Sequence, residues 1–252
     1  MPIRLSFPSP LPPRRLPAAA AWLLAAAGAT AQPMSSASPA SAPFAVPDTL
    51  AQRVQACVVC HGKEGRATGQ GYFPRIAGKP AGYLYNQLVN FREGRRSYAA
   101  MTYLVEHLSD AYLREIAGHF AALDLPYPPP QPATAAADAL ARGETLALRG
   151  DAARQLPACV QCHGDALTGV QPAIPGLLGL PRDYVVSQFG AWTTGQRRAA
   201  APDCMAQIAR RLGATDIAAV AAWLAARPLP ADAHPVATVA LPLPLPCGSG
   251  PK

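Results

Sequence analysis

Hydrophobic side chains recur mostly at steps of three and four residues in two stretches of the chain. They are Leu108, Leu113, Ile116 and Phe120 in the first stretch, and Leu212, Ile217, Val220 and Leu224 in the second. This spacing is typical of one face of an amphipathic helix. Ser109-Asp110 opens the first stretch and Thr215-Asp216 the second, and an acidic first turn suits the helix dipole. We therefore predict a helix in each stretch.

Further helices are predicted after Pro80 and Pro181, where large side chains form one stripe. The stripe residues are Tyr83, Gln87 and Phe91 in the first case, and Tyr184, Gln188 and Trp192 in the second. A helix is also expected before each of two cysteine pairs. No segment shows convincing strand alternation, so the fold class predicted is all-α.

The chain contains an internal duplication. At an offset of 101, six residues fall on identical residues: Pro74, Gly78, Pro80, Tyr83, Gln87 and Gly94 on Pro175, Gly179, Pro181, Tyr184, Gln188 and Gly195. Arg96 likewise falls on Arg197. The 252 residues are therefore expected to form two small domains rather than one large one. We call residues 48–124 the first unit and residues 135–228 the second unit.

The segments outside the two units have biased compositions. Residues 1–31 combine three arginines with an apolar run that ends in Ala29-Thr30-Ala31, which is typical of a cleaved signal peptide. A low-complexity leader (32–47), a stiff proline-rich linker (125–134) and a proline-rich tail (229–252) complete the chain. The sequence therefore predicts an exported, periplasmic protein. Anchoring by an uncleaved segment is the alternative.

Charge gives little functional information. The net charge of +7 falls to +4 without the three arginines of the leader, and residues 48–126 and 135–230 each hold nine basic and seven acidic side chains. This weak, evenly spread charge does not indicate a nucleic-acid partner.

Two nearly identical phrases, "ACVVCHG" and "ACVQCHG", carry the candidate chemistry. Each fits C-x-x-C-H, in which two thiols bind one haem as thioethers and the adjacent histidine binds its iron. The first motif supplies Cys57, Cys60 and His61, and the second Cys159, Cys162 and His163. A dithiol redox site needs no trailing histidine, and a zinc site would leave both histidines unexplained. Two covalently attached haem c groups are therefore predicted.

Two methionines are candidates for the sixth iron ligand. Met101 follows His61 by 40 residues, and Met205 follows His163 by 42. Matched spacing of nearly the only methionines favours ligation over core packing. His107 is a rival ligand in the first unit, and we interpret it, His119 and His234 as surface residues.

Over residues 48–228 the chain resembles the diheme class I c-type cytochromes of the cytochrome c4 type. The resemblance rests on the two C-x-x-C-H-G motifs, on P-x-x-x-G-x-P-x-x-Y-x-x-x-Q-x-x-x-aromatic-x-x-G in each unit, and on the downstream methionines. It implies two tandem class I cytochrome c domains, each wrapping one haem, with haem edges close enough for internal electron transfer.

The resemblance also implies roles around the haems. The carbonyls of Pro74 and Pro175 are expected to accept a hydrogen bond from the second ring nitrogen of each iron-bound histidine. Arg75, Arg96 and Arg197 meet haem propionates in one interpretation and are surface arginines in the other.

Two cysteines remain outside the haem motifs, and they depart from the basic family pattern. Cys204 precedes Met205, and Cys247 lies in the tail. In an oxidising compartment we expect them to pair and to tie the tail across the methionine side of the second haem. Intermolecular pairing is the alternative.

The function predicted is an electron carrier with no catalytic residues. It would shuttle electrons between a dehydrogenase or quinol-oxidising complex and a terminal oxidase, with membrane-associated redox proteins as partners and neither nucleic acid nor a small molecule as substrate. A diheme redox enzyme, such as a peroxidase or a sulfur-compound dehydrogenase, is the rival, since Cys204 beside Met205 could replace that ligand. A third possibility is a fixed electron-accepting subunit of a dehydrogenase.

Overall fold

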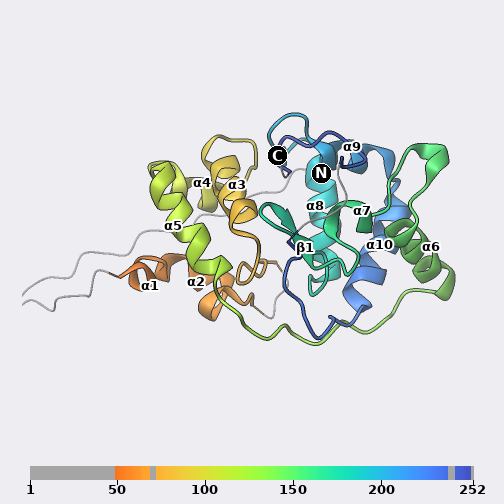
Figure 1. Ribbon diagram of the computed structural model, residues 1–252, viewed down its shortest axis with the longest axis horizontal. Coiled ribbons are helices and arrows are strands. Elements are labelled where there is room, and N and C mark those ends of the chain that lie inside the picture. Colours follow the sequence, from red (N-terminus) through yellow and green to blue (C-terminus); the bar gives the residue numbers. More distant parts are fainter. Residues whose placement is uncertain (1–48, 69–71, 238–241, 251–252) are drawn as a thin grey trace, which may run out of the picture. The chain divides into compact units, whose positions relative to one another are not determined.

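A computed structural model describes residues 49–68, 72–237 and 242–250, and the described part is mostly helical (Figure 1). The signal peptide and the low-complexity leader predicted from the sequence lie outside the described residues. None of the described helices is both long and apolar enough to cross a membrane.

Helices of the first unit form two adjoining hydrophobic clusters. The elements are α1 (Leu50–Arg53), α2 (Gln55–His61), η1 (Lys63–Gly65), α3 (Ala81–Arg92), α4 (Ala99–Val105) and α5 (Asp110–Ala121). Helix α5 is the helix predicted from the periodic pattern, and the Ser109 side chain accepts a hydrogen bond from the Tyr112 amide at its start. Leu113 and Phe120 of α5 are almost fully buried, so the predicted apolar face forms the core of this unit.

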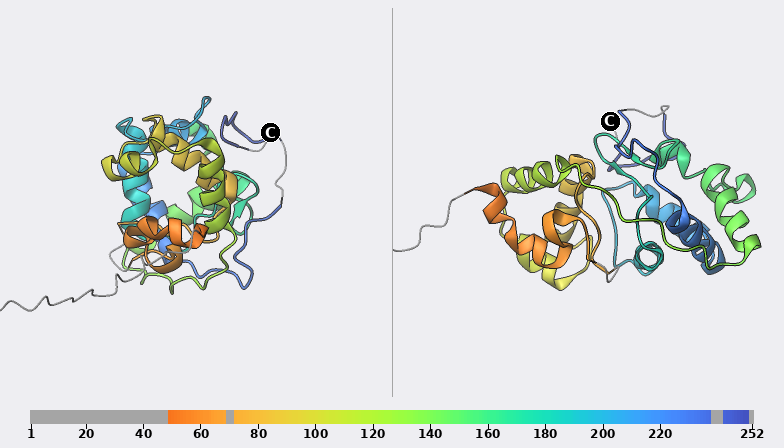
Figure 2. Two further views of the ribbon diagram at one scale, coloured as in Figure 1. Left: turned by 90° about the vertical axis from the view of Figure 1, so that its left-hand side faces the viewer. Right: turned by 90° about the horizontal axis from the view of Figure 1, so that it is seen from below.

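Helices of the second unit surround one larger cluster. The elements are α6 (Ala137–Leu148), η2 (Ala152–Arg154), α7 (Val160–His163), α8 (Arg182–Thr193), α9 (Cys204–Arg211) and α10 (Ala214–Ala226). Helices α6 and α10 lie side by side (Figure 2). A Cβ atom at Gly143 of α6 would lie 2.3 Å from the carbonyl oxygen of Ala219, so glycine permits this close approach.

The start of α10 differs from the prediction. The helix begins at Ala214 rather than after Thr215-Asp216, and no side chain caps its first turn. The Asp216 side chain is 12% exposed and forms ion pairs with Arg142 at 2.9 Å and Arg154 at 2.6 Å. Its carboxylate therefore joins α10 to α6 and η2, a contact that helical periodicity does not reveal.

A small sheet is present where we predicted no strands. Strands β1 (Gly169–Val170) and β2 (Ile174–Pro175) pair antiparallel, and Val236 of the tail pairs in parallel with Val170. Two-residue strands are too short for an alternating pattern. The tail thus extends a sheet of the second unit.

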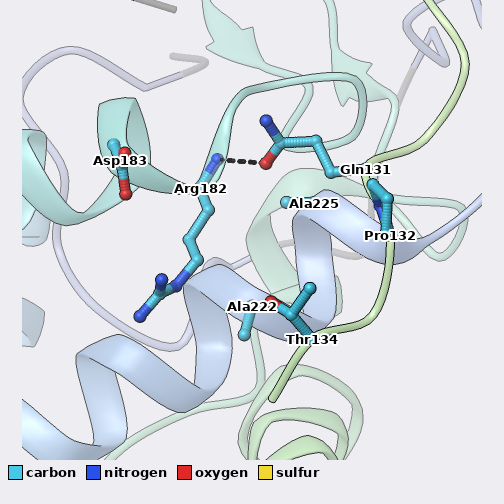
Figure 3. Close-up of a pocket in the computed structure, with 7 residues that line it drawn as sticks. All are labelled: Gln131, Pro132, Thr134, Arg182, Asp183, Ala222 and Ala225. Carbon is cyan, nitrogen blue, oxygen red and sulfur yellow. Dashed lines mark hydrogen bonds between the residues drawn. The ribbon is translucent and has the colours of Figure 1, made fainter.

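The proline-rich segment 125–134 contacts the two units at several of its residues. The Tyr127 ring lies under the Arg75 guanidinium, and a Cβ atom at Gly179 would lie 2.5 Å from it. Further on, the Gln131 amide donates to the Ala225 carbonyl, and its side chain accepts from the Arg182 amide (Figure 3). The hollow in Figure 3 is lined by linker, α8 and α10 residues and by none of the candidate haem residues.

Candidate haem sites

Each C-x-x-C-H motif lies on a short helix that ends at its histidine. The first is on α2 and the second begins at the N-cap of α7, and a glycine follows each histidine. Gly62 has φ 76° and Gly164 has φ 83°, a conformation that favours glycine. A Cβ atom at Gly62 would also lie 2.3 Å from the Ala67 carbonyl oxygen. The repeated glycine therefore allows the chain to turn sharply after the histidine.

Both histidines are oriented by a proline carbonyl. His61 Nδ1 lies 2.8 Å from the Pro74 oxygen, and His163 Nδ1 lies 2.7 Å from the Pro175 oxygen. Because Nδ1 donates to a carbonyl in this arrangement, Nε2 is left to bind a metal. Burial lowers the pKa of both imidazoles, which favours the neutral form that binds a metal.

None of the four motif cysteines takes part in a disulfide, and all four are partly buried. Burial raises the pKa of Cys57 and Cys162, and raises that of Cys159 to about 11. A reactive dithiol site needs the opposite shift, since its thiolate is the nucleophile. An uncharged thioether suits these buried positions.

Both candidate methionines pack against a hydrophobic cluster of their unit. Met101 lies on α4 against a cluster that includes Leu113, and Met205 lies on α9 against the cluster that also contacts Cys159. Both are partly buried. In the second unit the structure thus brings a motif cysteine and the candidate methionine to one cluster.

The remaining histidines lie outside these clusters. The His107 side chain is 90% exposed and pairs only loosely with Glu106 at 3.5 Å. The His234 side chain is 62% exposed and lies 2.8 Å from Asp232, whereas His119 is partly buried. The surface interpretation therefore suits His107 and His234 better than His119.

The surface interpretation of two arginines is wrong. Arg75 is 4% exposed and Arg197 is 6% exposed, and their guanidinium groups bind backbone and side-chain oxygens. Arg75 donates to the carbonyls of Leu125, Pro126 and Ala77, so it also fastens the linker.

Buried cations without a carboxylate partner, and two buried donors without any partner, suit a group that carries anionic acceptors. Arg75, Lys79 and Arg197 are buried, and none of them forms an ion pair with a carboxylate of the described residues. Trp192 Nε1 in the second unit and Thr68 Oγ1 in the first are buried without a hydrogen-bond partner in the described part of the chain. Buried charges and donors need partners. The propionates of a porphyrin supply such acceptors, so the residues present fit haem.

Sequence reasoning missed two of these residues, Lys79 and Tyr127. Lys79 lies between Gly78 and Pro80, two residues that the repeat itself marks, and Tyr127 is the aromatic residue of the linker. In the sequence, Lys79 is marked only by its charge and Tyr127 only by its aromatic ring, each in a segment that contains proline. Neither signal indicates burial without the fold.

Cys204 and Cys247 form a disulfide. The tail is held beside it, because the Gly248 amide donates to the Pro202 carbonyl at 2.9 Å. Further back, the Val236 amide donates to the Gly169 carbonyl at 3.0 Å. The tail is thus attached to the second unit both at its small sheet and beside Met205.

No family model matches the chain, but individual proteins do. The thiosulfate dehydrogenase electron acceptor of Thiomonas intermedia is 38% identical over 194 residues, which cover 77% of this chain and 86% of that protein. The corresponding protein of Stutzerimonas stutzeri is 37% identical, with 68% and 78% covered. Cytochrome c4 of Pseudomonas aeruginosa is 32% identical, with 67% and 82% covered.

Solved structures agree with these relatives. Cytochrome c4 from Pseudomonas stutzeri superposes with a TM-score of 0.58 at 27% identity, covering 69% of this chain and 95% of that one. Thiosulfate dehydrogenase TsdBA from Marichromatium purpuratum gives a TM-score of 0.61 at 34% identity, with 69% of this chain covered. The match spans only 36% of the TsdBA chain. The chain therefore belongs to the cytochrome c4 group of diheme c-type cytochromes, which are electron-transfer proteins with two covalently bound haem c groups.

Proposed function

We propose that each unit is a separate haem domain, with its own attachment site and ligands. Cys57 and Cys60 bind one haem as thioethers, and Cys159 and Cys162 bind the other. His61 and Met101 would hold the first iron, and His163 and Met205 the second. The matched histidine–proline hydrogen bonds and the four partly buried cysteines outside any disulfide support this assignment.

Haem c supplies an iron that cycles between the ferric and ferrous states and so carries one electron. The protein's own residues set the reduction potential of this iron. Pro74 and Pro175 fix the ring orientation of the two histidines and keep Nδ1 occupied. A thioether ligand from Met101 or Met205 would favour the ferrous state more than a second histidine ligand would. The surrounding hydrophobic clusters limit the access of water.

The donor that we propose is a thiosulfate dehydrogenase of the periplasm. The observation that carries this proposal is the 38% and 37% identity to two thiosulfate dehydrogenase electron acceptors over most of both chains. The protein would accept electrons one at a time from that enzyme and pass them to a membrane-associated acceptor leading to a terminal oxidase. This agrees with the predicted electron carrier and narrows its donor from dehydrogenases in general to one class.

Stopped-flow absorbance tests this donor. The oxidised diheme protein is mixed with a purified thiosulfate dehydrogenase and thiosulfate, and growth of the ferrous α-band is followed. We expect fast reduction of both haems with enzyme and substrate together. Thiosulfate alone and enzyme alone are the controls. Absence of reduction by the complete mixture, in a protein that dithionite reduces fully, would show that the donor belongs to another class.

The diheme-enzyme alternative depended on a free Cys204 thiol beside Met205. In the structure that sulfur is bonded to Cys247, so it is not available as a ligand while the disulfide is intact. Carbon monoxide added to the reduced protein distinguishes the two functions. A carrier with both irons six-coordinate leaves the spectrum unchanged, whereas an enzyme with an open iron binds the gas.

A further inference from the structure

Lys79 of the first unit is a buried cation beside the histidine loop of the second unit. It is 4% exposed, and its Nζ lies 3.4 Å from the carbonyl oxygen of Gly176. Gly176 directly follows Pro175, whose own carbonyl holds His163 Nδ1 at 2.7 Å. The charge of one unit therefore lies next to the loop that orients the candidate iron ligand of the other.

No acidic side chain of the described residues neutralises Lys79 through an ion pair. Its neighbours are the Tyr127 ring, whose centre lies 5.7 Å from Nζ, and the positive Arg75. Burial, and then the charge of Arg75, lower the pKa of Lys79 to about 8. The amine is therefore still mostly protonated at pH 7, and its field acts in a region of low dielectric constant.

The repeat shows that this charge has no counterpart. At the offset of 101 the residue equivalent to Lys79 is Leu180. The cation that acts on His61 is Arg96, which has its own counterpart in Arg197. Each candidate iron ligand thus lies in the field of one cation, Arg96 for His61 and Lys79 for His163, but Lys79 is supplied by the other unit.

We propose that Lys79 raises the reduction potential of the second haem, so that its charge helps to set how an electron is distributed between the two units. The inference rests on the proposed attachment of that haem through His163. A ferric iron carries one more positive charge than a ferrous iron, so a nearby buried cation favours the ferrous state. The step is the transfer of one electron from the first iron to the second, and the lysine keeps its proton throughout.

Redox titration of the full diheme protein tests the proposal through Lys79→Met. This substitution removes the charge and keeps a side chain of similar length. We expect the potential of the second haem to fall and the electron distribution between the haems to change on the order of tenfold, equivalent to about 59 mV for one electron. The two potentials are assigned by Met101→His and Met205→His, each of which lowers the potential of its own haem.

Three further variants separate charge from structure. Arg149→Met removes an equal charge at an exposed position and should leave the difference between the potentials unchanged. Lys79→Arg keeps the charge and should retain most of that difference. Lys79→Gln keeps a donor for the Gly176 carbonyl, and it replaces Lys79→Met if the latter does not fold with two haems.

The proposal is overturned if Lys79→Met and Lys79→Gln leave the second potential unchanged, or if Lys79→Arg lowers it as much as they do. An equal change from Arg149→Met would overturn it as well. A pyridine haemochrome spectrum of every variant reports how many haems are attached. It therefore distinguishes failure of the proposed attachment sites from failure of the proposed role of Lys79.

Discussion

Arg96 and Arg197, which occupy equivalent positions in the two repeats, pair with each other in an isolated antiparallel bridge. Each guanidinium donates to glutamines of both units. Arg96 binds Gln87 at 3.0 Å and Gln188 at 2.8 Å, and Arg197 binds Gln188 at 2.8 Å and Gln87 at 3.1 Å. Because the units are duplicates, each brings the same side chains to this contact. The repeated stripe and the repeated arginine thus join the two units to each other.

Arg197→Gln is expected to weaken this contact. Its loss removes one of the two guanidinium donors of Gln87 and of Gln188, the other being Arg96, so the free energy of unfolding should fall by about 1–3 kcal/mol. Denaturant titration of the diheme protein measures the change. Hydrogen exchange at the Ser97 amide, which donates across the contact to the Gln196 carbonyl at 2.8 Å, should become faster.

Arg182→Gln serves as the control, since Arg182 is exposed and only its backbone amide forms the hydrogen bond to Gln131. It should change neither stability nor exchange. Equal losses in both variants would mean that Arg197 contributes nothing beyond a surface arginine.

Replacing one candidate methionine at a time is expected to change one haem at a time. Met101→His should lower the potential of the first haem, because histidine favours the ferric state more than a thioether does. It should also halve the weak methionine-to-ferric-iron absorption near the red end of the spectrum. Met205→His should do the same for the second haem. Tyr103→Phe, next to the first site, should change neither quantity, and an unchanged absorption in either histidine variant would contradict that ligand assignment.

Opening the disulfide is expected to loosen the tail. It closes a loop of 43 residues, so the double variant Cys204→Ser/Cys247→Ser should lose about 3–4 kcal/mol of unfolding free energy. Limited proteolysis should then cut the tail before the rest of the second unit. Native protein should show no alkylatable thiol by mass spectrometry, and two such thiols would exclude the disulfide.

The single variant Cys247→Ser tests whether the Cys204 sulfur can bind the iron, because it leaves a free Cys204 thiol beside Met205. If its spectrum differs from that of the double variant, the free sulfur reaches the iron. Identical spectra would limit the role of the disulfide to holding the tail.

Acid is expected to weaken the ion pairs of Asp216. Burial by itself raises the pKa of this carboxyl, but hydrogen bonds from Arg142 and Arg154 outweigh it, and the pKa lies below its ordinary value of 3.8. A carboxyl with a lowered pKa stabilises the fold above its ordinary pKa and loses this contribution as the pH falls through the lowered value.

Asp216→Asn should therefore cost about 1–3 kcal/mol at pH 7 and progressively less below about pH 4. Denaturant midpoints at the two pH values measure this. The exposed Asp183→Asn is the matched control and should have little effect at either pH. A cost that is independent of pH would show that the carboxylate charge is not what stabilises α10.

The sequence alone determined the features that depend on local spacing. C-x-x-C-H places two thiols three residues apart and an imidazole directly after the second, within one helical turn, so the cofactor follows from a few residues. The apolar periodicity that ends at Phe120 defines α5 because each residue advances a helix by a fixed angle. The duplication was likewise visible, since it is a property of the residue order.

Only the tertiary structure decided what depends on contacts between distant segments. Arginine is usually exposed, so residue type places Arg75 and Arg197 at the surface. Their burial follows from the packing of the linker and of the two units. Asp216 looks like a helix-opening residue in the sequence, yet it forms ion pairs with Arg142 and Arg154, 74 and 62 residues away. The burial of Lys79 beside Gly176 depends on two loops 97 residues apart. Desolvation and pairing of charges are set by which segments meet in space, and local residue order does not contain that information.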